Sequence, residues 1–344
     1  MPIRVATVRA TDVPATQTNI PVYVDLGRVG ATALTLAEAQ SSRWYTDTDL
    51  VTQMAREIVS LTEGHGKYAS LTSTSKIAID YDGIRADYGV GATYGRNAVW
   101  SDYRAVYHLG DTTDSTGNGY TLTNTNSVPF TGTGKLGSDT ADYGASNPNT
   151  SAGKKLLATS NLGVAGNVSA VFSAWLRRHN EITLVNNNEE MMLAHRSNSG
   201  ADRFWQAAYQ FNGGAYRYLM YPGRTPFGLY LFTAGTTWFK YKVVRNSTTN
   251  YQSYLGGALI NTASFGTAST GQNLFGLGTE GGNFGLWRGL FDEARVKLGT
   301  DSANWETTEY NNQNAEATFW GTWTTFGGGG GPSEVARRGA VMMM

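Results

Sequence analysis

The residues of this chain that could carry out acid–base chemistry are carboxylates, and their spacing argues against catalysis. Cleavage of a glycosidic bond needs two carboxyl groups roughly 5 to 9 Å apart. Glu189 and Glu190 are adjacent in sequence, and so are Asp292 and Glu293. In a strand, the members of each pair would point to opposite faces. We therefore predict a protein that is not an enzyme, in which Asp292 is buried or half-buried and hydrogen-bonded.

Nucleophilic and metal chemistry find little support in the sequence. The four histidines are widely separated, and no two have the short spacing of a metal-binding motif. The sequence therefore predicts scattered histidines that form no site: His65, His108, His179 and His195. Cysteine is absent, which excludes disulfides and thiolate ligands. No Gly-x-Ser-x-Gly motif surrounds any serine.

Calcium is the one cofactor that the sequence leaves open. Residues 111–119 offer the oxygen atoms of Asp111, Asp114 and Asn118 within a short loop, as a hard cation requires. The same residue types also form ordinary tight turns, in which they hydrogen-bond to their own backbone. We expect the turn, with at most weak calcium binding and no other cofactor.

Aromatic side chains in the second half of the chain are candidates for a binding surface. Exposed rings can stack on sugars or contact another protein. In an alternating strand about half of them should face the core, so only part of the set would be available. The candidate residues are Trp205, Tyr209, Tyr216, Tyr218 and Tyr221.

Composition favours an all-β protein. The chain of 344 residues has 42 glycines, 19 tyrosines, 9 tryptophans and only 16% charged residues, which suits half-buried strands joined by many turns. Lys and Arg number 27, as do Asp and Glu, and no long run of one sign occurs. We therefore expect no nucleic-acid binding. No apolar stretch has the length of a membrane span, and residues 1–7 alternate like a strand rather than a signal peptide.

Alternating patterns locate several strands. Ile20, Val22, Val24 and Leu26 share one face of a predicted strand. Residues 169–176 form another, and residues 238–245 should pair with 252–255 across a turn. Further strands are expected at 43–49, 76–81, 191–195, 204–211 and 216–221, with a helical turn at 305–312 and a last ordered segment at 317–323 that closes the second unit.

Two stretches carry a resemblance to a known family. Residues 289–296 (Gly-Leu-Phe-Asp-Glu-Ala-Arg-Val) and 305–313 resemble the closing strand and exit helix of laminin-G-like, concanavalin A-like sandwiches. Residues 100–111 and 114–119 resemble the opening of such domains in bacterial and phage surface proteins. The resemblance implies a jelly roll over residues 98–326. Some glucanases share this architecture and carry a Glu-x-Asp-x-x-Glu strand, which is absent here.

The preceding region resembles a small β-sandwich domain of unknown function that often lies directly before a laminin-G-like domain. The matching segments are residues 20–24, 44–49, 56–58 and 87–89, although Asp87 replaces a tyrosine and Leu50 a common glycine. We assign this domain to residues 1–97. Residues 327–344 are a Gly-rich C-terminal arm, predicted to dock on a neighbouring subunit through Val335, Arg337, Arg338, Val341 and Met342.

Together these features predict a structural or binding protein built of two β-sandwich domains. The first interpretation is a tailed-phage virion component, such as a capsid decoration, tail or fibre protein, with other virion proteins and its own copies as partners. The alternative is a carbohydrate-binding module of an extracellular or cell-surface adhesion protein, with a surface glycan as partner. Neither interpretation requires membrane insertion.

Overall fold

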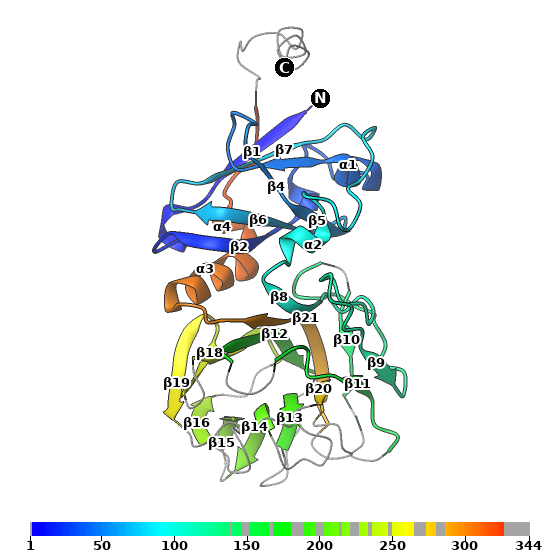
Figure 1. Cartoon of the computed structure of the whole chain (residues 1–344), viewed down its shortest axis with the longest axis vertical. Coiled ribbons are helices and arrows are strands. Elements are labelled where there is room, and N and C mark those ends of the chain that lie inside the picture. Colours follow the sequence, from blue (N-terminus) through cyan, green and yellow to red (C-terminus); the bar gives the residue numbers. More distant parts are fainter. Residues whose placement is uncertain are drawn as a thin grey trace.

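The chain folds into two β-sandwich units arranged along the long axis of the molecule (Figure 1). Among the described residues strands far outnumber helices, and the longest helix has 12 residues, so the predicted all-β class is confirmed. The computed structural model describes residues 2–326 except 138, 146, 148–150, 165–167, 180–188, 197–202, 213–214, 221–226, 233–235, 247–249, 265–272 and 280–285. Of the side chains in 203–212, 215–220 and 227–232, it describes those of Ala208 and Tyr218.

The first unit has a five-stranded sheet, in the order β22-β1-β7-β3-β4, and a three-stranded sheet, β2-β6-β5. Its strands are β1 (Ile3–Thr7), β2 (Gln17–Val24), β3 (Arg43–Tyr45), β4 (Gln53–Met54), β5 (Arg56–Ser60), β6 (Glu63–Leu71), β7 (Lys76–Asp80) and β22 (Thr324–Thr325). Its short helices are η1 (Ala10–Asp12), η2 (Leu26–Arg28) and α1 (Leu36–Ser41). Thr35 and Glu38 form a capping box that starts α1.

The core of the first unit lies between its two sheets. Ile20, Val22 and Val24 on β2 are buried in it, as predicted, whereas Leu26, expected on the same strand, is buried on η2. Trp44 is fully buried as well. Burial of this apolar face against the opposite sheet is the main force that holds the two sheets together.

The second unit packs two seven-stranded sheets face to face. One sheet contains β10 (Ala141–Asp142), β21 (Gly289–Leu298), β12 (Ala170–Arg178), β17 (Phe239–Arg245), β18 (Asn250–Leu255) and β19 (Ala258–Ser264) in that order, with β8 (Tyr103–Tyr107) also on β21. The other contains β16 (Phe227–Phe232), β15 (Ala215–Met220), β14 (Arg203–Asn212), β13 (Glu189–Arg196), β20 (Leu274–Leu277), β11 (Lys155–Ala158) and β9 (Thr123–Thr125). The short helix α2 (Arg96–Val99) lies between the two units (Figure 1).

Aromatic residues from both sheets fill the core of the second unit. Phe172 on β12 and Phe275 on β20 have ring centroids 6.1 Å apart, and Tyr107 stacks on Phe275 at 6.3 Å. The predicted strand at 169–176 is confirmed as β12. The predicted pairing of 238–245 with 252–255 is confirmed as the antiparallel pair β17–β18.

After β21 the chain returns to the first unit. Helix α3 (Ala303–Asn314) begins after Ser302, whose hydroxyl accepts a hydrogen bond from Trp305 N, and α4 (Glu316–Phe319) follows it. Strand β22 then pairs with β1. Phe319 and Trp320 are fully buried in the core of the first unit, together with Tyr68.

This return corrects one sequence-based expectation. The segment 317–323 does not close the second sandwich. The tryptophans between Trp305 and Trp323 lie in the core of the first unit, whereas the sequence predicts them in the domain at 98–326. The buried side of α3 is polar, and includes Glu306, Glu309 and Gln313. A helix without an apolar stripe gives no sign in the sequence of which core it faces.

Candidate functional site at the junction of the two sandwiches

Charged and aromatic side chains from both units are buried together where the sandwiches meet. We call this group the junction cluster, and it consists of Glu57, Glu63, His65, Trp100, His108, Glu293 and Arg295. Each of these residues is at most 8% exposed. Charged groups are rarely buried so completely unless they are paired, so the cluster is the most unusual chemical feature of the described chain.

The sequence Glu63-Gly64-His65-Gly66 on β6 explains how the first unit presents its part of the cluster. Residues two apart on a strand share a face, so Glu63 and His65 point the same way, and the glycines lie on the other face. A Cβ atom on Gly64 or Gly66 would lie 2.9 or 2.8 Å from the ring of Trp44. Only glycine lets Trp44 pack this closely, and its packing leaves the opposite face free to carry the polar residues.

The second unit contributes His108 and Glu293. His108 directly follows β8, and Glu293 lies at a β-bulge of β21, where the register with β12 shifts. The backbone of Glu293 is left-handed, with φ 53°. A bulge redirects a side chain, and here Glu293 reaches His108 while its neighbour Asp292 accepts hydrogen bonds from the backbone of Lys135 and Leu136.

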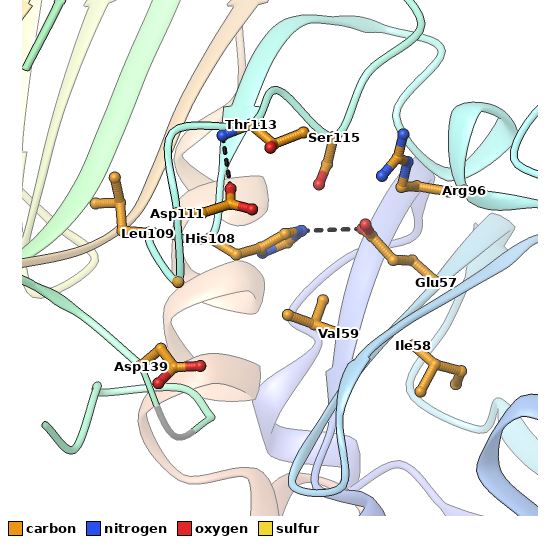
Figure 2. A pocket seen from close by; sticks show the side chains of 11 residues that line it. Glu57, Ile58, Val59, Arg96, His108, Leu109, Asp111, Thr113, Ser115 and Asp139 are labelled. Atoms are coloured by element: carbon orange, nitrogen blue, oxygen red, sulfur yellow. Dashed lines mark hydrogen bonds and ion pairs between the residues drawn. The ribbon is translucent and has the colours of Figure 1, made fainter. Parts of the chain in front are cut away.

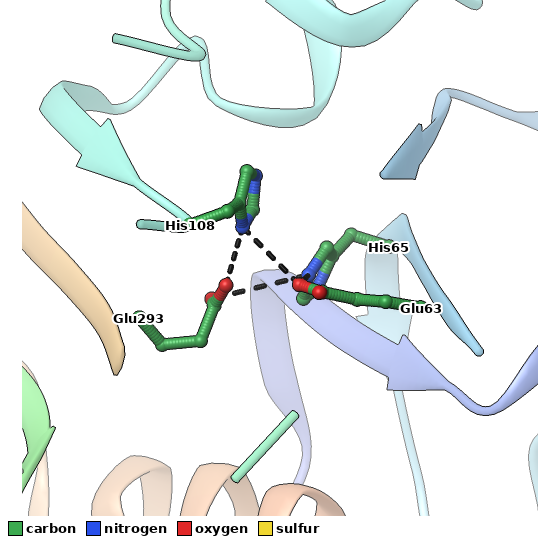
Figure 3. Close-up of side chains that lie close together, drawn as sticks. All are labelled: Glu63, His65, His108 and Glu293. Atoms are coloured by element: carbon green, nitrogen blue, oxygen red, sulfur yellow. Dashed lines mark hydrogen bonds and ion pairs between the residues drawn. The ribbon is translucent and has the colours of Figure 1, made fainter. Parts of the chain in front are cut away.

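Four of these side chains converge (Figure 3). Glu63 Oε1 lies 2.8 Å from His65 Nε2 and 3.3 Å from His108 Nδ1. Glu293 contacts His108 Nδ1 through Oε1, and its Oε2 lies 3.9 Å from His65 Nε2. The two imidazole rings are stacked, with centroids 5.0 Å apart. One ligand atom from each of the four residues lies within 4.8 Å of the other three, an arrangement that could hold a metal ion.

The expectation that the histidines are scattered is therefore wrong for His65 and His108. Each comes from a different sandwich, so the sequence contains no short metal-ligand spacing between them. Two signals in the sequence bear on this site. One is the Glu-Gly-His-Gly alternation on β6, and the other is the presence of charged residues in the most buried part of β21.

Further buried side chains surround this group of four and orient His108 and Glu293. Glu57 Oε2 lies 2.9 Å from His108 Nε2 and accepts a hydrogen bond from Trp100 Nε1. Arg295 donates to Glu293 Oε2 from Nε at 3.1 Å, and its guanidinium carbon lies 4.8 Å from the centre of a Trp100 ring. Burial disfavours the charged imidazolium, but Glu293 and Glu57 outweigh it and hold the pKa of His108 well above its usual value.

A pocket opens beside the junction cluster (Figure 2). It has a volume of about 330 Å³, and Glu57 and His108 lie on its wall together with Arg96, Asp111 and Asp139. The lining is thus mostly polar, and the pocket connects the outer side of the cluster to the surface. This volume lies at the lower end of the range of about 300–1,000 Å³ that is usual for small-molecule pockets.

A second buried ionic network fastens α3 to the second unit. Lys240 Nζ lies 2.7 Å from Glu309 Oε2, and Lys242 Nζ lies 2.6 Å from Asp301 Oδ2 and also contacts Glu306. Glu309 continues the network to Arg295 at 3.2 Å. The junction cluster and α3 are thereby linked through one chain of charges.

Glu306 should make the protein less stable as the pH rises. Burial raises the pKa of Glu306 to about 7; Lys242 opposes the shift, and Glu309 and Asp301 add to it. A carboxyl group with a raised folded-state pKa contributes most stability below its unfolded value of 4.5, and loses that contribution as the pH rises through about 7. Glu306→Gln should therefore gain roughly 1–3 kcal/mol relative to the wild type between pH 5 and pH 8. Urea unfolding of both proteins at pH 5 and pH 8 tests this prediction. The same difference in free energy of unfolding between variant and wild type at the two pH values would contradict it.

Asp292 has the environment predicted from the sequence. It is fully buried, and Oδ2 accepts hydrogen bonds from Lys135 N at 2.6 Å and Leu136 N at 2.8 Å. Asp292→Ala should lower the free energy of unfolding by about 1–3 kcal/mol, because the buried amide of Leu136 and the partly buried amide of Lys135 lose their acceptor. Loss of a glycan-hydrolysing activity with an unchanged melting temperature would instead assign Asp292 a catalytic role.

The loop proposed for calcium forms a turn that satisfies its own polar groups. Asp114 is buried and accepts hydrogen bonds from the backbone of Val106, Thr116 and Tyr120. Asp111 accepts from Thr113 N. Asn118 donates its amide to the carbonyl groups of Tyr103 and Arg104. The oxygen atoms of Asp114 are therefore used by the protein itself.

We expect calcium to bind this loop weakly at most. Addition of calcium to protein stripped with EDTA should leave its melting temperature unchanged. Asp114→Ala should lower the melting temperature with or without calcium, because several buried donors lose their acceptor. A calcium-dependent rise that disappears in Asp114→Ala would identify a calcium site instead.

The proposed aromatic surface is only partly described. Tyr218 is wrong as a surface residue, because it is 3% exposed and its ring stacks on Tyr241 in the core at 5.5 Å. Strand β14 carries Trp205 and Tyr209, and β15 carries Tyr216, but these three side chains lie outside the described residues. Also outside them are Tyr221 and the residues of the predicted arm: Val335, Arg337, Arg338, Val341 and Met342.

No family model and no curated protein matches the sequence. Similar solved structures include the binding domain of botulinum neurotoxin serotype G, with a TM-score of 0.49, 14% identity, and coverage of 64% of this chain and 54% of that one. The binding domain of Paraclostridial Mosquitocidal Protein 1 has a TM-score of 0.47, 13% identity, and coverage of 64% and 55%. The chain thus spans about half the length of these two structures.

A third similar structure is domain 4 of AbnA, a GH43 extracellular arabinanase from Geobacillus stearothermophilus, in complex with arabinotriose. It has a TM-score of 0.40 and 18% identity, and the match covers 60% of this chain and 97% of that domain. Among the described residues of the present chain, no helix has both the length and the apolar character needed to span a membrane.

Proposed function

We propose that this chain is a non-enzymatic structural and binding protein, and specifically a virion component of a tailed bacteriophage, such as a capsid decoration, tail or fibre protein. The observation that supports this proposal most is the junction. The chain crosses it once between α2 and β8 and again between β21 and α3, and His108 of the second unit pairs inside it with Glu57 and Glu63 of the first.

Such a junction holds the two sandwiches in one relative orientation. Buried ion pairs add little net stability compared with an apolar core, but each charge is satisfied only when its partner is in place. A rotation of one sandwich against the other would separate Glu63 and Glu57 from His108. A fixed two-domain body presents the same surface in every copy, which suits a component repeated in a symmetric particle.

The predicted arm at 327–344 supplies a test of assembly. Deletion of these residues should leave the melting temperature unchanged, because the described cores end at residue 326, while it should impair oligomerisation or incorporation into particles. Gradient-purified virions from the source should contain the chain in mass spectrometry. Absence of the chain from such particles would overturn the virion proposal.

The alternative, a carbohydrate-binding module at a cell surface, is supported by the concentration of aromatic residues on β14 and β15. Glycan-array binding by the wild type that is lost in Trp205→Ala, together with absence of the chain from virions, would favour this alternative. Tyr218→Phe is a suitable control, because the hydroxyl group of a core tyrosine should not affect sugar binding.

A further inference from the structure

We propose that Glu63, His65, His108 and Glu293 form a binding site for a divalent transition metal ion, best matched by zinc, which joins the two sandwiches. The four residues supply two imidazole nitrogens and two carboxylates to one point. Two come from β6 of the first unit and two from the second unit. This inference is independent of the proposed virion role.

The distances between the ligand atoms fit a tetrahedral ion. Zinc binds histidine nitrogen and carboxylate oxygen at about 2.0–2.2 Å, which places neighbouring ligands of a tetrahedron about 3.3–3.6 Å apart. The separations found here are 2.8 Å for Glu63–His65, 3.3 Å for Glu63–His108 and 3.9 Å for Glu293–His65. Glu293 Oε1 contacts His108 Nδ1 more closely than this, so these two side chains would have to move apart to admit an ion.

Two of the four residues, His108 and Glu293, are held by partners in the way that metal ligands are. A histidine that binds a metal usually gives its other ring nitrogen to a carboxylate, which fixes the ring and its tautomer. His108 does so through Nε2, which lies 2.9 Å from Glu57 Oε2, and Trp100 Nε1 in turn donates to Glu57. Arg295 holds Glu293 in the same way, by donating to Oε2.

The balance of charge also suits a cation. Glu57, Glu63 and Glu293 bring three carboxylates into the buried cluster, and Arg295 is the permanent cation that touches it directly. A dication among the four ligands would offset the negative charge of these carboxylates. The pocket beside the cluster reaches one of the four ligands, His108, and its partner Glu57.

The kind of metal and its role follow from the ligand set. Mixed imidazole and carboxylate ligands suit zinc better than the hard cations calcium and magnesium, which prefer oxygen alone. Four protein ligands leave no open coordination position, which is the arrangement of a structural site and not of a catalytic one. The bound ion would therefore strengthen the contact between the sandwiches.

The test uses the full chain, stripped with EDTA and then freed of chelator. Titration with Zn²⁺ should show one ion bound per chain and should raise the melting temperature. Co²⁺ should give the intense visible absorption of a tetrahedral site. Failure of the wild type to bind Zn²⁺ stoichiometrically, or the weak absorption of octahedral Co²⁺, would overturn the proposal.

Variants locate the site. Glu63→Gln and His65→Gln should each weaken Zn²⁺ binding by more than about 100-fold, and Glu57→Gln, which changes only an outer partner, by about 10–100-fold. His179→Gln is the matched control, since His179 pairs with Asp142 outside the cluster, and it should bind Zn²⁺ like the wild type. Unchanged affinity in Glu63→Gln and His65→Gln would place the ion elsewhere. If these two fail to fold, unchanged affinity in Glu57→Gln would overturn the proposal instead.

Discussion

Arg295→Met is expected to lower the free energy of unfolding by about 3–5 kcal/mol, the effect of removing one partner from a buried ion pair. Arg295 is 2% exposed and connects Glu293 in the junction cluster to Glu309 on α3. Its loss leaves both carboxylates without their guanidinium partner in a place that water does not reach. Methionine keeps much of the volume of the side chain, so the loss of charge dominates the effect.

The control for this prediction is an ion pair at the surface. Lys76→Met breaks the ion pair between Lys76 and Asp47, whose side chains are 42% and 55% exposed. This change should lower the free energy of unfolding by no more than about 1 kcal/mol. Urea unfolding of both variants gives the comparison. Equal, small losses in the two variants would show that the buried charges contribute no more to the junction than a surface pair does.

Trp320→Ala should lower the free energy of unfolding by about 3–5 kcal/mol, because it leaves a large cavity in the core of the first unit. Trp320 is fully buried, its ring stacks on Tyr68 at 6.2 Å, and its Nε1 donates to Tyr23 O at 2.9 Å. The substitution therefore removes apolar contacts and one of the two hydrogen bonds that Tyr23 O accepts, the other coming from Asn312 Nδ2.

The first unit should need the C-terminal return of the chain in order to fold. A chain limited to residues 1–97 lacks β22 and the tryptophans of the C-terminal return, so it should not fold alone. Trp238→Ala is the control for Trp320→Ala, because Trp238 is only half-buried and lies in the second unit. It should lower the free energy of unfolding by less than Trp320→Ala does. A stable, cooperatively folded fragment 1–97 would contradict the assignment of the return to this core.

Local patterns were sufficient to predict many of the strands. Alternation identified β2 and β12, and turn residues between two apolar runs identified the pair β17–β18. Asp292 was predicted as a buried, hydrogen-bonded residue because a carboxylate beside a buried strand needs partners. Each of these features depends on residues that lie close together in the sequence.

The junction could not be predicted in this way, because its contacts join distant parts of the chain. His108 meets Glu57 across 51 residues and Glu293 across 185 residues. A bulge at Glu293 also changes the direction of its side chain, which simple alternation cannot anticipate. Helix α3 buries charged and amide side chains, so its sequence resembles that of an exposed turn.

Differential scanning calorimetry of the full chain tests the central claim that the junction unites the two sandwiches. The account predicts one transition, with equal calorimetric and van't Hoff enthalpies. Arg295→Met should shift the whole transition to lower temperature. Two separate transitions in the wild type, of which Arg295→Met and Trp320→Ala each move only one, would show that the sandwiches unfold independently and would contradict the account.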